Sequence, residues 1–132
     1  MAVVDASVIV EFLREENPSR MLDERLAAEE HALWAPHLID AEVGHALRRE
    51  VRLARMDAEA AADAIWEVND LPLRRVEHEH LVHVAWDLRE NFTFYDGLYV
   101  ALALMLGEPL LTFDARMARS GLDLPIEILP QA

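Results

Sequence analysis

The sequence predicts an α/β protein, a three-layer sandwich in which helices flank a central, mainly parallel sheet of about five strands. Short apolar runs of strand length alternate with longer segments whose apolar residues recur every three or four positions. Strands separated by helices need crossover connections, which make neighbouring strands parallel. The 132 residues match the size of one domain and contain no linker or repeat, so residues 1–132 are expected to form a single domain.

Short apolar runs bounded by acidic, proline or glycine residues predict the strands. Asp5 ends the first run, Pro36 stops the second, and Asp114 follows the fourth. The expected strands cover residues 2–5, 32–35, 73–76, 110–113 and 126–129.

Helical spacing of apolar residues fills the intervals between these strands. Ser7 is a candidate N-cap for the first helix, and Gly107 stands where a left-handed C-cap would end the last long helix. Residues 96–106 are apolar almost all round, which indicates a central, buried helix. The expected helices cover residues 7–14, 18–30, 38–54, 57–68, 78–90 and 96–106, with a helical turn at 115–119.

Composition excludes several classes of protein. The chain has no cysteine, which excludes disulfides and thiolate-bound metals. Its longest strongly apolar run, residues 98–106, is shorter than the roughly 20 residues of a membrane-spanning helix. The N-terminus lacks the plan of a secretory signal, so a cytoplasmic protein is expected. A net charge of −13 repels nucleic acid, so any nucleic-acid role needs metal ions or a local arginine patch.

Four carboxylates, each at an end of an apolar segment, form the candidate site: Asp5, Glu42, Asp96 and Asp114. In an alternating strand and helix protein, such ends meet at one edge of the sheet. Two carboxylates about 4 Å apart repel by roughly 4 kcal/mol at an effective dielectric constant near 20, so a proton or a cation must bind. Hard oxygen ligands favour Mg²⁺ or Mn²⁺ over zinc or copper.

Each of the four acids also has an ordinary structural explanation. Asp5 and Asp114 suit turns after strands, and Asp96 suits the first turn of a helix. Glu42 suits an ion pair with a nearby arginine on its own helix. The combination favours a metal site, because all four fall at matching ends of elements.

Two hydroxyls and one arginine accompany the acids. Ser7 lies two residues after Asp5, and Thr112 shares a strand face with Asp114 by alternation. Both hydroxyls are expected to support the aspartates. Arg116 follows Asp114 by two residues and is a candidate contact for a substrate phosphate, with a solvated surface role as the alternative.

These residues stand in segments that resemble a known family. The segments are VVDASVI at residues 3–9, Glu42 early in the third helix, YDGLYVALA at residues 95–103 and LTFD at residues 111–114. Together and in this order they resemble the PIN-domain family and, more narrowly, the VapC toxins of bacterial toxin–antitoxin pairs. The resemblance covers the whole chain and implies a PIN-like fold.

The resemblance implies an endoribonuclease that depends on Mg²⁺, with Mn²⁺ as a substitute. Its acidic metal-site positions correspond to Asp5, Glu42, Asp96 and Asp114, and its hydroxyl positions correspond to Ser7 and Thr112. One or two ions would activate a water that hydrolyses the RNA phosphodiester bond, leaving 5′-phosphate and 3′-hydroxyl ends.

The resemblance also implies partners, namely an RNA substrate, a cognate basic antitoxin and a second copy of the chain in a homodimer. The acidic net charge suits a basic antitoxin. Two departures from the family pattern concern substrate fit rather than the metal site: Gly97 replaces a more usual alanine, and Phe113 is bulkier than the residue often found there.

Three alternatives stay open on sequence. The chain would be a non-catalytic acidic module that docks a basic partner if the carboxylates were only solvated. A phosphoryl-transfer domain is disfavoured, because such domains use an active-site lysine and all twelve basic residues here are arginine. A zinc site at His78, His80 and His83 is also disfavoured, because a polar helix start explains these residues.

Overall fold

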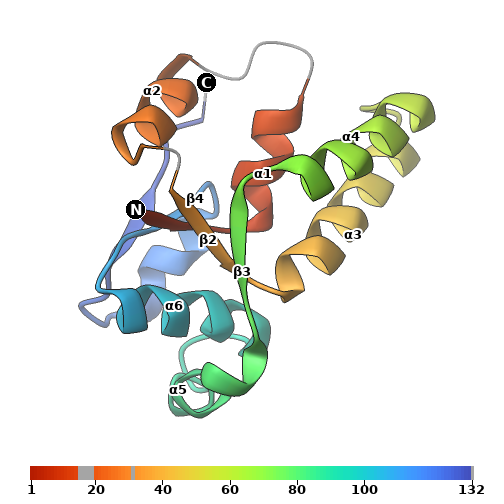
Figure 1. Ribbon diagram of the computed structural model, residues 1–132. Coiled ribbons are helices and arrows are strands. Elements are labelled where there is room, and N and C mark those ends of the chain that lie inside the picture. Colours follow the sequence, from red (N-terminus) through yellow and green to blue (C-terminus); the bar gives the residue numbers. More distant parts are fainter. Residues whose placement is uncertain (15–19, 31, 132) are drawn as a thin grey trace.

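A computed structural model describes residues 1–14, 20–30 and 32–131 of the chain (Figure 1). The strands are β1 (Ala2–Val4), β2 (Leu33–Pro36), β3 (Leu73–Val76), β4 (Leu110–Thr112) and β5 (Ile126–Ile128). The helices are α1 (Ala6–Leu13), α2 (Arg20–Ala28), α3 (Leu38–Arg52), α4 (Ala58–Asp70), α5 (Val82–Asp87) and α6 (Phe94–Leu106), with 3₁₀ turns η1 (His78–His80) and η2 (Ala115–Ser120).

The five strands form one parallel sheet in the order β3-β2-β1-β4-β5, which confirms the predicted α/β class. β1 is the central strand, with Val3 paired to Trp34 on one side and to Leu110 on the other. Val3 and Val4 are fully buried, as a strand covered on both faces requires. Asp5 therefore follows a central strand and not an edge strand.

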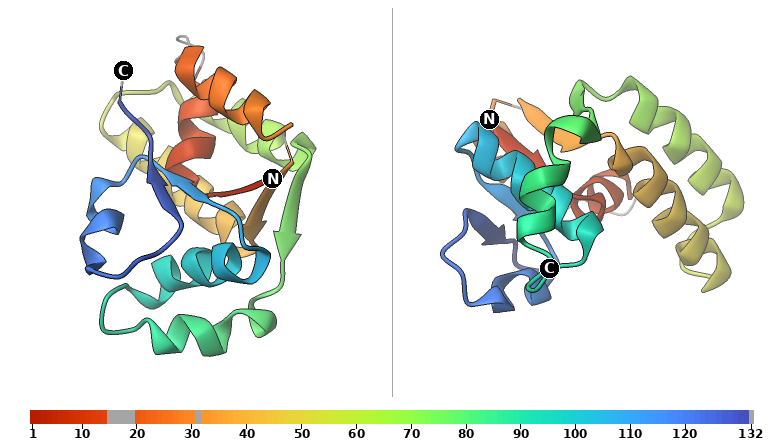
Figure 2. Two further views of the ribbon diagram at one scale, coloured as in Figure 1. Left: turned by 90° about the vertical axis from the view of Figure 1, so that its left-hand side faces the viewer. Right: turned by 90° about the horizontal axis from the view of Figure 1, so that it is seen from below.

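Helices cover both faces of this sheet and complete the three predicted layers. Figure 2, left, shows α5 and α6 below the strands and α1 and α2 above them, and α3 packs against α1 on that upper side. α6 lies between the sheet and α5, and its residues 97–103 are all buried. The nearly uniform apolar character of this helix follows from contacts on both sides.

Gly97 marks the closest approach between α5 and α6. A Cβ atom at this position would lie 3.2 Å from the backbone oxygen of Ala85. Because that contact is tighter than ordinary packing, the glycine lets the two helices approach each other. The departure from alanine thus has a packing explanation in this chain.

Two expectations about helix ends were wrong. Asp5, and not Ser7, is the N-cap of α1, because its carboxylate accepts from the backbone N–H of Val8 at 3.3 Å. The single helix expected over residues 78–90 is instead η1 followed by the short helix α5. The expected helix start near residue 18 lies outside the described residues. Gly107 ends α6 with a left-handed φ of 65°, as predicted.

Among the described residues, no helix combines the length and apolar character that crossing a membrane would require. Two of the three tryptophans lie at the surface, since Trp66 is 72% exposed and Trp86 is 58% exposed. These two side chains are therefore not part of the core.

Candidate active site

Asp5 is held at the carboxyl end of β1 by three hydrogen bonds. Its carboxylate accepts from the hydroxyl of Ser7 at 2.6 Å, from the hydroxyl of Thr112, and from the N–H of Val8. Burial raises the pKa of Asp5 above its ordinary value, and these donors only partly offset that effect. The structure thus places a partly desolvated, oriented carboxylate at the central strand's end.

The two predicted hydroxyls join the ends of β1 and β4. Ser7 Oγ also accepts from the backbone N–H of Phe113 at 3.0 Å, and Thr112 Oγ1 accepts from the N–H of Asp114 at 3.0 Å. Each hydroxyl therefore donates to Asp5 while it accepts from the segment that carries Asp114. Thr112 is the one polar residue among the described residues that is fully buried, and these bonds satisfy it.

Asp96 and Glu42 come from two helices and join Asp5 and Asp114 in the candidate site. These four carboxylates are called the acidic edge below. Asp96 lies in the first turn of α6, where its backbone N–H donates to Thr93 Oγ1 at 3.1 Å. Burial raises the pKa of Asp96, and the charge of Asp114 raises it further. Burial likewise raises the pKa of Glu42, with the charge of Asp96 adding to the effect. Both carboxyls thus lie in surroundings that disfavour an uncompensated negative charge.

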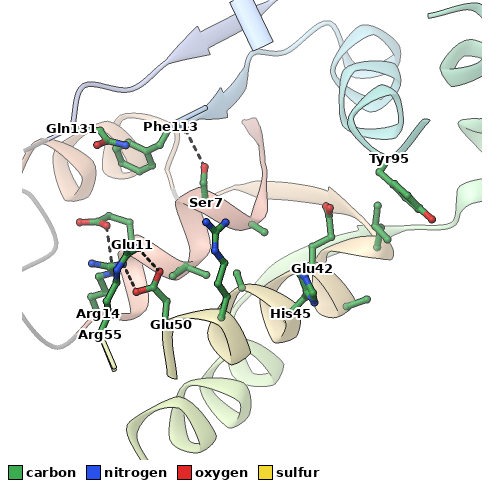
Figure 3. A pocket seen from close by; sticks show the side chains of 16 residues that line it. Ser7, Glu11, Arg14, Glu42, His45, Glu50, Arg55, Tyr95, Phe113 and Gln131 are labelled. Carbon is green, nitrogen blue, oxygen red and sulfur yellow. Dashed lines mark hydrogen bonds and ion pairs between the residues drawn. The ribbon is translucent and has the colours of Figure 1, made fainter. Parts of the chain in front are cut away.

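Glu42 makes no ion pair with a described arginine. The ion pair with an arginine of its own helix, which the sequence allowed as an alternative, is therefore absent among the described residues. It projects from the second turn of α3, and Ser7 projects to the same side from α1 (Figure 3). Asp40, two residues earlier in sequence, does pair with an arginine, since Arg75 Nε lies 2.7 Å from Asp40 Oδ2. This ion pair links the first turn of α3 to β3.

Tyr99 is a site residue that the sequence argument missed. It lies one turn after Asp96 on α6 and is 1% exposed. Burial raises the pKa of Tyr99, and the adjacent Glu42, with the charges of Asp5 and Asp96, raises it further. Its three-residue spacing from Asp96 was the available signal. The Tyr99 hydroxyl is placed to donate to Glu42, an interaction that partly offsets the rise in the pKa of Glu42.

Asp114 is engaged by a residue of its own turn. Arg116 Nε lies 3.0 Å from Asp114 Oδ1, and Arg116 Nη2 lies 2.9 Å from Asp114 Oδ2. This bidentate pair lowers the pKa of Asp114 below its ordinary value. Arg116 is 79% exposed at its side chain, so water screens the pair.

The donor set of the edge suits a hard divalent cation, although its carboxylates are spread out. Among the described residues, no three of the four acids bring oxygens within 4.8 Å of one another. Asp5 is turned toward two hydroxyls and Asp114 toward Arg116. Mg²⁺ keeps several of its waters and commonly takes only one or two carboxylates directly, so a set of this width fits it.

A second acidic group follows β3, the outer strand next to β2. Glu77, Glu79 and His80 have ligand atoms within 4.8 Å of one another, and all three are exposed. The neighbouring His78 has a structural role, because its Nε2 accepts from the N–H of Leu38 at 2.9 Å and so caps the start of α3. The histidines therefore do not form the three-histidine zinc site considered from sequence.

Comparison with known proteins places this geometry in a family. The family model for the PIN domain matches residues 2–121. Ribonuclease VapC1 of Mycobacterium tuberculosis is 45% identical over 130 residues, which covers 96% of this chain and 94% of that protein.

Solved structures show the same fold. VapC20 of Mycobacterium tuberculosis, a toxin that cleaves the sarcin–ricin loop, has a TM-score of 0.66 at 18% identity over 92% of this chain and 95% of its own. VapBC2 of Rickettsia felis, bound to a promoter DNA fragment, has a TM-score of 0.64 at 11% identity over 96% of this chain and 97% of its own. The family model and the close relative, taken with the acidic edge, establish that the chain belongs to the VapC family of PIN-domain proteins.

Proposed function

We propose that this protein is a toxin of a toxin–antitoxin pair that cuts RNA with the help of Mg²⁺, or Mn²⁺ in its place. One observation carries the proposal: four carboxylates from four separate elements meet at one sheet edge in a chain 45% identical to a named ribonuclease. A membrane role has no support, and the cytoplasm is the proposed place of action.

Asp5, Asp96 and Asp114 would hold the ion or ions, and Glu42 would complete the set directly or through water. The bound metal supplies an activated water and neutralises charge on the departing oxygen. Ser7 and Thr112 keep the Asp5 carboxylate in one orientation, because each hydroxyl donates to one of its two oxygens. This orientation reduces the reorganisation needed when the ion arrives.

Arg116 has a proposed part that follows from its present partner. Its guanidinium covers both oxygens of Asp114 at 2.9–3.0 Å, so an ion bound to Asp114 would release it. The released arginine would lie beside the scissile phosphate, for which its planar fork is well suited. This residue would then contribute to substrate binding.

The proposed partners besides RNA are a basic antitoxin and a second copy of the chain. A basic antitoxin is consistent with the net charge of −13. A structural neighbour of this chain, VapBC2 of Rickettsia felis, is bound to a DNA fragment from its promoter. Light scattering of the purified chain, alone and with its co-encoded neighbour, would measure both associations.

The proposed activity is tested by incubating the purified protein with structured RNAs in Mg²⁺, in Mn²⁺ or with chelator. Asp96→Asn serves as the inactive control. Cleavage is expected only with metal and with the native Asp96, and the products should carry 5′-phosphate and 3′-hydroxyl ends. Chelator-resistant cleavage, or a 2′,3′-cyclic phosphate, would contradict the proposed chemistry.

The non-catalytic module is not favoured, because the chain matches a ribonuclease over nearly its full length. If the carboxylates were only solvated, Asp5 would not need two hydroxyl donors and burial. Mn²⁺ binding that persists unchanged in Asp5→Asn and Asp96→Asn would favour that module.

A further inference from the structure

A long groove leaves the acidic edge and runs between α1 and α3. It encloses about 900 Å³ and begins beside Ser7 and Glu42. Figure 3 shows Glu42, His45 and Tyr95 toward one end of the groove and Arg14, Glu50 and Arg55 gathered at the other. The groove is therefore continuous with the proposed cleavage site and extends well beyond it.

The lining of this groove differs in charge from the rest of the molecule. Three arginines and three glutamates line it, so their charges balance, whereas the whole chain carries a net charge of −13. One of the three glutamates, Glu42, belongs to the proposed metal site, and a bound cation would make the groove positive. A polyanion in this groove therefore meets less repulsion than the net charge of the whole chain would impose.

The side chain of one groove arginine has no partner among the described residues. Arg14 and Arg55 lie 3.1 Å and 3.7 Å from the carboxylate of Glu50 and are engaged with it. Arg49 lines the same groove, but its side chain makes no ion pair or hydrogen bond with the described residues. An unpaired guanidinium suits a phosphate, which it can contact through two parallel hydrogen bonds.

The next residue on the same helix provides a contrast. Arg48 is exposed and also lacks an ion pair among the described residues, but it does not line the groove. These two neighbouring arginines of α3 therefore differ in position, since Arg49 lines the groove and Arg48 does not.

An exposed aromatic ring lies at the end of the groove nearest the acids. Tyr95 is 61% exposed, lines the groove and immediately precedes Asp96. Such a ring offers a stacking surface to an unpaired base, and proteins that bind single-stranded RNA combine aromatic rings of this kind with basic grooves.

We propose that this groove binds the single-stranded RNA that flanks the scissile bond, with Arg49 on a backbone phosphate and Tyr95 stacked on a base. The inference rests on the proposed ribonuclease function and adds where the strand runs. Single-stranded RNA is favoured over a duplex because a stacking ring needs an unpaired base.

The test measures binding of a short fluorescent single-stranded RNA to the full chain carrying Asp96→Asn, in Mg²⁺, over a series of salt concentrations. Adding Arg49→Ala should weaken binding about tenfold and reduce the salt slope by about 0.7 to 1. Arg48→Ala, the matched control, should change neither quantity. Tyr95→Ala should weaken binding by roughly tenfold, whereas Tyr95→Phe should preserve it.

Equal effects of Arg49→Ala and Arg48→Ala would overturn the proposal, since charge alone would then explain binding. Stronger binding of the same RNA annealed to its complement would overturn the single-stranded assignment. If the groove binds an antitoxin segment and not RNA, Arg49→Ala will leave the RNA affinity unchanged. That result would also overturn the proposal. A failure of the ribonuclease proposal can be distinguished from a failure of the groove proposal. The first is measured as absent RNA cleavage by the native protein, and the second as unchanged RNA binding by the variants.

Discussion

The acidic edge and the Glu77–Glu79–His80 cluster have similar chemistry but different construction. The edge collects acids from β1, α3, α6 and the end of β4, whereas the cluster comes from one short stretch around η1. The cluster has its ligand atoms closer together, yet all three of its side chains are exposed. Closeness of ligands alone therefore does not identify a functional site.

Burial and support distinguish the two groups. At the edge, burial raises the pKa values of Asp5, Glu42 and Asp96. Two hydroxyls also fix the Asp5 carboxylate. In the cluster, His80 lies 3.7 Å from Glu79 and 4.0 Å from Glu77, and all three side chains are exposed. Water and salt screen such exposed charges, so they have little need of an ion.

The largest effect is expected from Asp5→Asn or Asp96→Asn. Each removes one negative ligand of the edge, so RNA cleavage in Mg²⁺ should fall by at least about a hundredfold. Single-turnover cleavage assays measure the loss. Asp40→Asn, a change of the same type at an acid outside the edge, is the control and should retain activity. Near-normal cleavage by Asp96→Asn would remove the basis for the edge as the active site.

Thr112→Val tests the support around Asp5 while leaving all four acids in place. It deletes the hydroxyl that donates to Asp5 and accepts from the N–H of Asp114. Cleavage and Mn²⁺ affinity should fall by roughly 10- to 100-fold, the usual cost of losing such a partner. Thr112→Ser keeps the hydroxyl and should recover most of both. Equal values for the valine and serine variants would show that the hydroxyl is unimportant.

The raised pKa of Glu42 predicts that this residue lowers the folding stability of the metal-free protein as pH rises. Because the folded-state pKa lies above the ordinary 4.5, the stability linked to Glu42 is complete below pH 4.5 and is lost as pH rises through the folded value. Glu42→Gln should therefore raise the melting temperature near neutral pH, by roughly a few degrees, and have little effect in acid.

Thermal unfolding with chelator, at several pH values, measures this difference between the variant and the native chain. Adding Mn²⁺ should stabilise the native chain more than the glutamine variant. A glutamine variant that melts below the native chain at neutral pH without metal would contradict the assignment of Glu42 to a strained, ion-dependent position.

The smallest effect is expected in the exposed cluster. Glu77→Gln and Glu79→Gln should leave cleavage and Mn²⁺ affinity unchanged within error, because surface substitutions of this kind remove only screened charges. The same single-turnover and metal-titration assays apply. A clear loss in either variant would mean that the two acidic groups cooperate, and the contrast between them would no longer hold.

Much of the fold followed from local sequence patterns. All five strands were predicted close to their observed bounds, because short apolar runs between turn residues report burial directly. The capping role of Ser7 was predicted wrongly, because serine and aspartate compete for the same N–H group. Only the β4 segment, which lies more than a hundred residues along the chain, gives Ser7 another partner, the N–H of Phe113.

The four acids were found from their positions at the ends of elements, but Tyr99 was not. In sequence Tyr99 is one aromatic residue in an apolar helix, and only the packing of α6 beside α3 brings its hydroxyl to Glu42. The ion pair of Asp114 with Arg116 was also missed, since Arg116 was considered either as a substrate contact or as a solvated surface residue. Spacing fixes which side of a helix a residue occupies, but not what faces it.

The sequence by itself determined the α/β class and the strands and helices, and it predicted Asp5, Glu42, Asp96 and Asp114 as the candidate site. Those features depend on residue type and period, which neighbours along the chain impose. The tertiary structure decided that β1 is central and that Arg49 faces a groove while Arg48 does not. These outcomes depend on how crossovers pack helices onto the sheet, and packing joins residues far apart in sequence.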